Sequence, residues 1–476
     1  MSTAPAAPPI PVPSARSRPA ARRLAESALT VPGLAAFEQT VRDTREHVLT
    51  VAELVPLHQL HGWHYDEGTG FIAHESGRFF SVEGLQVETQ SPLTTWGQPI
   101  VNQPETGILG LLVKEIDGIL HFLMQLKAEP GNRNGLQLSP TVQATWSNYT
   151  GVHGGLPVPY LEFFQDPARR RVIADARQSE QGSRFLRKRN RNMIVETEEP
   201  VEARNGFVWL TLGQIHRLLA TEDLVNMCTR SVLACLPLGD GASARNEGFG
   251  AALARSLARG GPELHPLVNV LSWITEARTR SETRTRTVSL DALTDWEFTG
   301  GRIRHRAGRH FDVIGVRVKA VSREVGQWWQ PMIRAQSTQL AALLVTHVRG
   351  VLHVLMQLRA EPGLTDAAEL APTVQCTPDD CAQLPPVERP PFLDLVQNAR
   401  TADIRFDTVL SDEGGRFYHT GSRHLVVETG WLPEPPDFRW LTLGQLEELT
   451  QHSHYVNIQA RSVLACLRSL FHGGDR

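Results

Sequence analysis

The stretch from His121 to Gly131, HFLMQLKAEPG, decides how this chain is organised. It recurs from His353 to Gly363 as HVLMQLRAEPG, with nine of eleven positions identical and an offset of 353 − 121 = 232 residues. Three more stretches recur in the same order: PTVQ (140–143 and 372–375), WLTLGQ (209–214 and 440–445) and RSVLACL (230–236 and 461–467). A steady offset across the whole half of a chain indicates an internal duplication.

The repeat divides the 476 residues into four expected segments. Residues 1–25 are rich in Ala, Pro, Ser and Arg, and we expect a disordered tail because so little apolar surface cannot offset the entropy of ordering. The tail also lacks the apolar stretch of a secretory signal. Residues 26–236 form the first module, residues 237–262 a Gly- and Ala-rich linker with a short helical stretch, and residues 263–476 the second module.

Each module is predicted to be α+β, with a mixed, mostly antiparallel sheet and packed helices. A helical pattern opens each half, and strand-like alternation and buried apolar runs follow it. Asp117 and Gly118 predict a hairpin turn between two of these strands. Thr211 is the expected N-cap of a closing helix, and residues 224–236 predict a second helix.

Composition excludes several classes of function. The net charge is −3, and no apolar run approaches the roughly 20 residues that span a bilayer, so we expect neither nucleic acid nor membrane as a partner. Five cysteines without a CxxC pair argue against a disulfide framework or structural zinc and fit a reducing cytoplasm. The sequence has no dinucleotide, P-loop, metalloprotease or nucleophile-elbow motif, so no cofactor and no metal are expected.

The repeated strand carries the first candidate site. Alternation places Gln125, Lys127 and Glu129 on one face, and the second copy keeps this character with Arg359 in place of Lys127. A row of amide, cation and carboxylate suits a polar pocket. The alternative is a solvent-facing strand with a cross-strand ion pair.

A loop after the next strand supplies further candidates, because loops that leave a sheet often carry sites. Its side chains offer donors, acceptors, an aromatic ring and a glycine that permits close backbone approach. The candidates of the first half are Gln143, Ser147, Asn148, Tyr149, Thr150 and Gly151, and those of the second half are Gln375, Cys376 and Thr377. The alternative is an ordinary Gly-rich turn.

Two more features complete the candidate list. A Gly turn followed by Arg can present amides and a guanidinium to phosphate, which selects Ser183 and the segment Glu413, Gly414, Gly415 and Arg416. Trp63 and Trp296 occupy equivalent positions. Either ring stacks on a nucleobase, an interaction worth about 1–3 kcal/mol, or belongs to the core.

The phrases MQLKAEPG, SPTVQATWSNY, APTVQCT, PPFLD and RSVLACL resemble the NDP-hexose 2,3-dehydratases over nearly the whole chain after Ala25. The resemblance implies two Nudix-like modules, a homodimer, and dTDP-4-keto-6-deoxy-D-glucose as substrate. It implies a 3,4-diketo-2,6-dideoxyhexose nucleotide as product, handed to a 3-ketoreductase in deoxysugar (antibiotic) biosynthesis. The Nudix metal box is missing.

The implied reaction sets chemical requirements for the site. The C4 ketone acidifies the C3 proton, a base removes it, and the enolate expels the C2 hydroxyl with help from an acid. We expect Lys127 to stabilise the enolate and Tyr149 to transfer a proton. Arg359 is a poor proton carrier, so we expect chemistry in the first half. A second nucleotide sugar would be held by Arg359, Gln375, Thr377, Gly414, Gly415 and Arg416.

Two rival functions stay open at this point. One is a Nudix-type nucleotide-sugar hydrolase, which a requirement for Mg²⁺ would favour. The other is a non-catalytic nucleotide-sugar binding module, which binding without turnover would favour.

Overall fold

Two large sheets with the same topology form the greater part of the molecule. The computed structural model describes residues 19–90, 93–145, 157–239, 248–321 and 326–472. The first large sheet has the order β10 (Arg171–Ser179), β11 (Arg189–Glu196), β6 (Gly107–Ile116), β7 (Ile119–Ala128) and β12 (Phe207–Thr211), with β8 (Leu136–Ser139) on β7 and β9 (Val142–Ala144) on β6. Its equivalent has the order β22 (Ile404–Ser411), β23 (Gly421–Glu428), β18 (Gln339–Val348), β19 (Val351–Ala360) and β24 (Phe438–Thr442), with β20 (Ala368–Ala371) and β21 (Val374–Cys376).

The pairing of these strands confirms the predicted α+β class. Strands β6 and β11 are parallel, as are β18 and β23, and the other pairs in both large sheets are antiparallel. The predicted hairpin is present, since Ile116 pairs with Ile119 across Asp117 and Gly118. Both turn residues have positive φ, 50° and 80°, which matches the twist that a two-residue hairpin requires.

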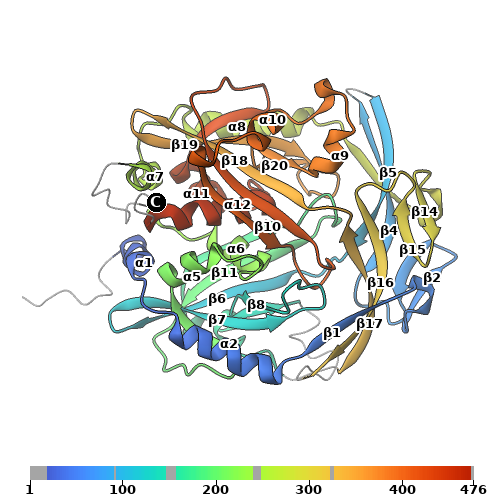
Figure 1. Ribbon diagram of the computed structural model, residues 1–476, viewed down its shortest axis with the longest axis horizontal. Coiled ribbons are helices and arrows are strands. Elements are labelled where there is room, and N and C mark those ends of the chain that lie inside the picture. The colour runs from blue at the N-terminus through green and yellow to red at the C-terminus, as the bar shows by residue number, and fades with distance from the viewer. Residues whose placement is uncertain (1–18, 91–92, 146–156, 240–247, 322–325, 473–476) are drawn as a thin grey trace, which may run out of the picture.

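Two smaller sheets exchange a strand between the halves. One has the order β13 (Arg284–Val288), β4 (Ser81–Gln90), β3 (Phe71–His74) and β2 (Trp63–Asp66), with β5 (Leu93–Asn102) on β4. The other has the order β1 (Thr50–Val55), β16 (Phe311–Ala320), β15 (Arg302–His305) and β14 (Trp296–Thr299), with β17 (Gln327–Ala335) on β16. Thus β1 of the first half completes the second-half sheet and β13 completes the first-half sheet, at the right of Figure 1.

One helix lies across an expected segment boundary. Helix α1 (Ala20–Leu29) begins inside the expected tail, because Leu24 and Ala28 are buried and Arg23 donates to Glu196 at 3.0 Å. Its equivalent α7 (Phe249–Leu257) is the short helix predicted within the linker, and it packs on β19. Equivalent serines join these helices to the large sheets. Ser27 Oγ accepts from Leu212 N at 2.9 Å, and Ser256 Oγ accepts from Leu443 N at 2.8 Å.

The remaining helices flank the large sheets. They are α2 (Ala35–His47), α4 (Glu162–Gln165), α5 (Leu212–Leu219), α6 (Met227–Leu233), α8 (Leu267–Arg280), α9 (Pro378–Ala382), α10 (Leu393–Gln397), α11 (Leu443–Thr450) and α12 (Ile458–Ser469). The predicted N-cap is confirmed, since Thr211 and Gln214 form a capping box at the start of α5. Thr442 and Gln445 repeat it at α11.

Helices α6 and α12 pack against each other at the centre of the molecule (Figure 1). Arg230 Nε donates to Ser462 Oγ at 2.6 Å, and Arg461 Nε donates to Ser231 Oγ at 3.0 Å. Both arginines are almost fully buried. The repeated RSVLACL stretch is therefore the pseudo-symmetric contact between the halves.

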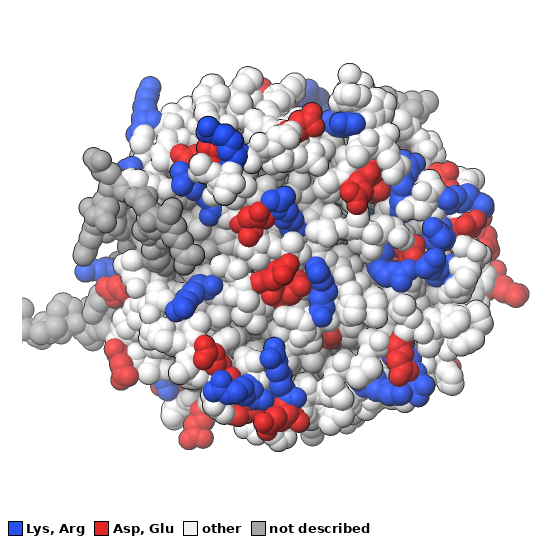
Figure 2. All heavy atoms as spheres, in the orientation of Figure 1, with Lys and Arg blue, Asp and Glu red and all other residues white. Residues whose placement is uncertain are grey.

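The face of the molecule in Figure 2 mixes both signs of charge, with acidic and basic side chains interspersed. Within the described ranges, no helix is both long and apolar enough to cross a membrane.

Candidate functional site

The polar face of strand β7 is half-buried. Lys127 Nζ lies 3.2 Å from Glu129 Oε1, and these side chains are 19% and 7% exposed. Gln143 Nε2 donates to Glu129 Oε1 at 3.0 Å, and Asn226 Nδ2 donates to Gln143 Oε1 at 3.1 Å. Among the described residues, no donor reaches the other carboxylate oxygen, Glu129 Oε2, although it is buried. This cluster is therefore not the solvent-facing ion pair of the alternative interpretation.

The second half repeats this cluster. Arg359 Nε lies 3.5 Å from Glu361 Oε1, and Gln375 Nε2 donates to the same oxygen at 2.7 Å. Asn457 Nδ2 donates to Gln375 Oε1 at 2.8 Å. Glu361 Oε2 likewise has no partner within the described part of the chain.

The two asparagines were missed by the sequence analysis. Asn226 and Asn457 cap α6 and α12 with their side-chain oxygens and reach the polar cluster with their side-chain nitrogens. The available signal was their common place, four residues before Arg230 and Arg461.

A loop from each half crosses to the cluster of the other half. Gly131 N donates to Gly414 O at 2.8 Å, and His419 N donates to Gly131 O at 2.9 Å. A Cβ atom at Gly131 would lie 1.7 Å from Phe417 O, so the approach of these backbones requires glycine. The Glu-Pro-Gly end of the repeated strand is therefore a contact between halves.

The reciprocal contact joins the second cluster to the first half. Gly363 N donates to Gly182 O at 2.7 Å, and Arg187 N donates to Gly363 O at 2.7 Å. A Cβ atom at Gly182 would lie 3.0 Å from Glu361 Cβ. Ser183, which follows, therefore lies beside the second-half cluster.

This crossing corrects one expectation. Gly414, Gly415 and Arg416 were expected to hold a ligand together with Arg359, but a Cβ atom at Gly414 would lie 3.0 Å from Glu129 Cβ, in the first-half cluster. The expectation failed because it assumed that each half builds its own pocket. We call the first-half cluster together with residues 413–416 the first pocket, and its equivalent with residues 181–184 the second pocket.

The first pocket holds groups with displaced pKa values. Burial, reinforced by Glu129, raises the pKa of Glu413 to about 7. Burial lowers the pKa of Lys188 to about 8, although Glu180 acts in the opposite direction. Burial also lowers the pKa of Arg416, whose guanidinium lies 4.1 Å from the centroid of the Phe80 ring.

The second pocket has different groups at the equivalent positions. Gln181 stands where the first pocket has Glu413, since 413 − 181 = 232, and Thr420 stands where it has Lys188, since 420 − 188 = 232. Arg184 replaces Arg416 and lies 4.3 Å from the centroid of the Phe311 ring. The two pockets therefore share an arrangement of residues but differ in groups that can exchange protons.

A glutamine from each small sheet holds each crossing loop. Gln330 Nε2 donates to Gly415 O at 2.6 Å, and Gln98 Nε2 donates to Ser183 O at 2.7 Å. Gly415 N also donates to Glu413 Oε1 at 2.9 Å. The small sheets thus position the loops that complete both pockets.

Trp63 and Trp296 lie in the core between the small sheets. Their indole nitrogens donate to Trp329 O at 2.7 Å and Gly97 O at 2.9 Å, each in the other half. Trp296 is only 4% exposed, which leaves no open ring face for a nucleobase and corrects that expectation. Trp63 is half-buried and packs against Phe80.

The remaining predicted residues fall into two groups. Cys376 is half-buried, and burial together with neighbouring Cys381 raises the pKa of its thiol. Thr377 accepts from Cys381 N at 3.1 Å through its carbonyl. The other group lies outside the described residues: Ser147, Asn148, Tyr149, Thr150 and Gly151.

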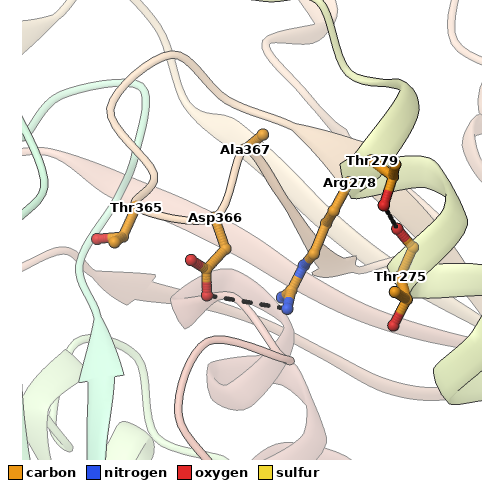
Figure 3. Close-up of a pocket in the computed structure, with 6 residues that line it drawn as sticks. All are labelled: Thr275, Arg278, Thr279, Thr365, Asp366 and Ala367. Carbon is orange, nitrogen blue, oxygen red and sulfur yellow. Dashed lines mark hydrogen bonds and ion pairs between the residues drawn. The ribbon is translucent and has the colours of Figure 1, made fainter.

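A separate surface hollow of about 530 Å³ lies between α8 and residues 365–367 (Figure 3). Arg278 points across it toward Asp366 at 3.8 Å and donates to Ala368 O at 3.0 Å. Its lining residues are Thr275, Arg278, Thr279, Thr365, Asp366 and Ala367, none of which is a predicted site residue. Across the described ranges, no group of three or more His, Cys, Asp or Glu side chains is arranged to hold a metal ion.

Comparison with known proteins places this geometry in a family. A family model described as NDP-hexose 2,3-dehydratase matches residues 34–236 and again residues 267–467. The chain is similar to the dTDP-4-dehydro-6-deoxy-alpha-D-glucopyranose 2,3-dehydratase of Amycolatopsis orientalis, with 45% identity covering 94% of both chains. It is 48% identical to the enzyme of the same name from Saccharopolyspora spinosa (88% of this chain, 87% of that one) and 45% identical to the one from Streptomyces violaceoruber (88% and 94%). The chain therefore belongs to the NDP-hexose 2,3-dehydratase family.

Proposed function

We propose that this protein is a hydro-lyase that removes water across C2 and C3 of dTDP-4-keto-6-deoxy-D-glucose. The product is a 3,4-diketo-2,6-dideoxyhexose nucleotide for deoxysugar biosynthesis. The observation that carries the proposal is the partly buried Lys127–Glu129 pair, 3.2 Å apart, in a chain 45–48% identical to enzymes named for this reaction. Within the described residues, Glu129 Oε2 has no hydrogen-bond partner, so it can accept from a ligand.

The first pocket supplies what the elimination requires. Negative charge develops on the C4 oxygen after the C3 proton leaves, and a fixed ammonium stabilises it in a pocket that excludes water. Lys127 is that cation, because Glu129 and the Gln143 carbonyl, at 3.4 Å, hold its Nζ in place. We assign Tyr149 a proton transfer to the same sugar, as a relay that returns to its starting state.

The second pocket is assigned to binding rather than chemistry. Arg359 stands in place of Lys127, and a guanidinium keeps its proton at any working pH. Arg359, Gln375, Cys376, Thr377 and Ser183 present polar groups to a second nucleotide sugar there. Trp63 is kept as a candidate contact for the nucleotide of the first pocket.

A coupled assay tests the function. The protein is incubated with dTDP-4-keto-6-deoxy-D-glucose, a 3-ketoreductase and NADPH. The mass of the nucleotide sugar is then measured by mass spectrometry. The expected product has lost one water and gained two hydrogens. An unchanged mass would contradict the dehydratase assignment. Release of a nucleoside phosphate that depends on Mg²⁺ would indicate the Nudix-type hydrolase, and binding without any mass change would indicate a binding module.

Three further assignments accompany the proposed reaction. Each large sheet with its helices is a Nudix-like unit, which is supported by one parallel strand pair in an otherwise antiparallel sheet. The protein is a cytoplasmic homodimer, which its five free thiols and the family resemblance support. A 3-ketoreductase consumes the product, because a vicinal diketone is reactive. Sedimentation of the purified protein tests the dimer.

A further inference from the structure

We propose that Glu413, which belongs to the second half, donates the proton to the departing C2 hydroxyl in the first pocket. This inference rests on the dehydratase function proposed above. It assigns the catalytic acid to the half of the chain that does not carry Lys127.

The crossing loop brings Glu413 to the first pocket. The contact is made by Gly414, whose added Cβ would lie 3.0 Å from Glu129 Cβ and whose carbonyl accepts from Gly131 N at 2.8 Å. Among the described residues, the only hydrogen bond to the Glu413 carboxyl comes from Gly415 N, at Oε1. The loop therefore fixes one oxygen and leaves the other for a ligand.

The unpartnered oxygen of Glu129 is the second, independent sign of a ligand here. Glu129 is only 8% exposed, and its Oε2 has no donor among the described residues, whereas its Oε1 accepts from both Gln143 and Lys127. A buried carboxylate oxygen without a partner is costly unless a ligand satisfies it. A sugar hydroxyl or an acidic C–H between Glu129 and Glu413 would do so.

The electrostatics give the two carboxyls different tasks. Burial and the charge of Glu129 raise the pKa of Glu413 to about 7, so a large fraction of Glu413 carries its proton at neutral pH. The Glu129 carboxylate instead has the Lys127 ammonium 3.2 Å away. An acid and a base are commonly built from two carboxyls in unlike environments.

The proton balance of the reaction closes on these two groups. Glu129 takes the C3 proton, and the electrons of the C3–H bond form the enolate that Lys127 stabilises. The enolate reforms the C4 carbonyl, makes the C2–C3 double bond and breaks the C2–O bond, while Glu413 gives its proton to the leaving hydroxyl, which departs as water. In the tautomerisation that follows, Glu129 protonates C2 and Glu413 takes the O3 proton, so both groups are reset.

The second pocket shows the contrast. Gln181 occupies the position of Glu413 and has no acidic proton to give. Arg359 occupies the position of Lys127. The equivalent cluster therefore lacks the acid, which agrees with the assignment of the elimination to the first pocket.

The test compares two leaving groups. Fluoride needs no proton to depart, so a 2-deoxy-2-fluoro analogue of the substrate bypasses the acid but still needs the base and Lys127. Kinetics are measured for the full-length protein and Glu413→Gln with both substrates. We expect kcat for water loss to fall by about 10²–10⁴-fold in the variant, with fluoride release within a few-fold of the parent protein.

Each other outcome has a definite meaning. If the parent protein acts on neither substrate, the proposed function itself fails. If Glu413→Gln loses fluoride release as strongly as water loss, the residue is structural, and if it keeps both, it is not the acid; either result overturns the inference. Asp407→Asn serves as a matched control, because this carboxylate pairs with Arg423 on the surface of the neighbouring strand pair, and it should keep both activities.

Discussion

Lys127 Nζ, near the end of β7, lies 3.2 Å from Oε1 of Glu129, which directly follows the strand, and these side chains are 19% and 7% exposed. The carboxylate orients the ammonium before substrate arrives. A cation that is already fixed needs no reorganisation when charge develops on the C4 oxygen.

Lys127→Met should lower kcat by about 10²–10³-fold, the usual effect of removing one oxyanion donor, and change KM much less. The coupled reductase assay measures both constants. Lys319→Met is the matched control, since that lysine is exposed on β16, and it should keep full activity. Tyr149→Phe is tested beside them. Full activity in both Lys127→Met and Tyr149→Phe would reject our assignment of the catalytic groups.

Arg230 should be needed for the stability of the folded protein. It donates to Ser411 O at 2.8 Å, two residues before Glu413, and to Ser462 Oγ at 2.6 Å. Hydrogen bonds of charged groups contribute about 1.5–3 kcal/mol each, so Arg230→Met should lower the free energy of unfolding by roughly 3 kcal/mol or more. Urea denaturation measures this change. Arg177→Met, on the exposed face of β10, should leave the midpoint unchanged. An unchanged midpoint for Arg230→Met would show that the buried guanidinium does not hold the loop.

Asp412 should destabilise the protein at neutral pH. Burial raises the pKa of this carboxyl from 3.8 to about 6, so the folded state binds its proton more tightly than the unfolded state. Its favourable contribution is complete below pH 4 and is lost as pH rises to about 6. Asp412→Asn should therefore gain stability relative to the parent protein across that window, by up to about 3 kcal/mol, and the gain should level off above it. Denaturation curves at pH 4, 5, 6 and 8 measure this, and a gap that does not vary with pH would contradict it.

The halves should not fold apart. A chain divided between residues 239 and 248 separates β1 from β16 and β13 from β4. We expect each fragment alone to be insoluble or to unfold without cooperativity, and the two expressed together to purify as one active complex. Size-exclusion chromatography and thermal unfolding distinguish these outcomes. Cooperative unfolding of either fragment alone would show that the exchanged strands are dispensable.

The sequence predicted those features that local chemistry determines. Asp117 and Gly118 specify their hairpin because both need positive φ, and Thr211 specifies a helix start because its side chain caps the backbone. The polar face of the repeated strand follows from alternation, and it is half-buried in both halves. These are properties of a few neighbouring residues.

Features that depend on which half supplies the partner were not predictable. The two small sheets are copies of each other, so β1 and β13 could each pair with the equivalent strand, β4 or β16, of either half. The alternation of side chains does not distinguish these two partners. For the same reason Gly414, Gly415 and Arg416 were expected beside Arg359. Helix α1 was missed because its Ala- and Arg-rich sequence resembles that of a disordered tail. In the structure Arg23 is buried against Glu196.

The strand exchange also governs how the protein is made. When the first half has emerged from the ribosome, β13 has not yet been synthesised. One edge of β4 therefore stays unpaired until residue 288 emerges. An open edge is a template for pairing with another nascent chain. Slow translation of the connecting region would prolong that exposure, whereas chaperones that cover the edge would raise the yield of intact enzyme.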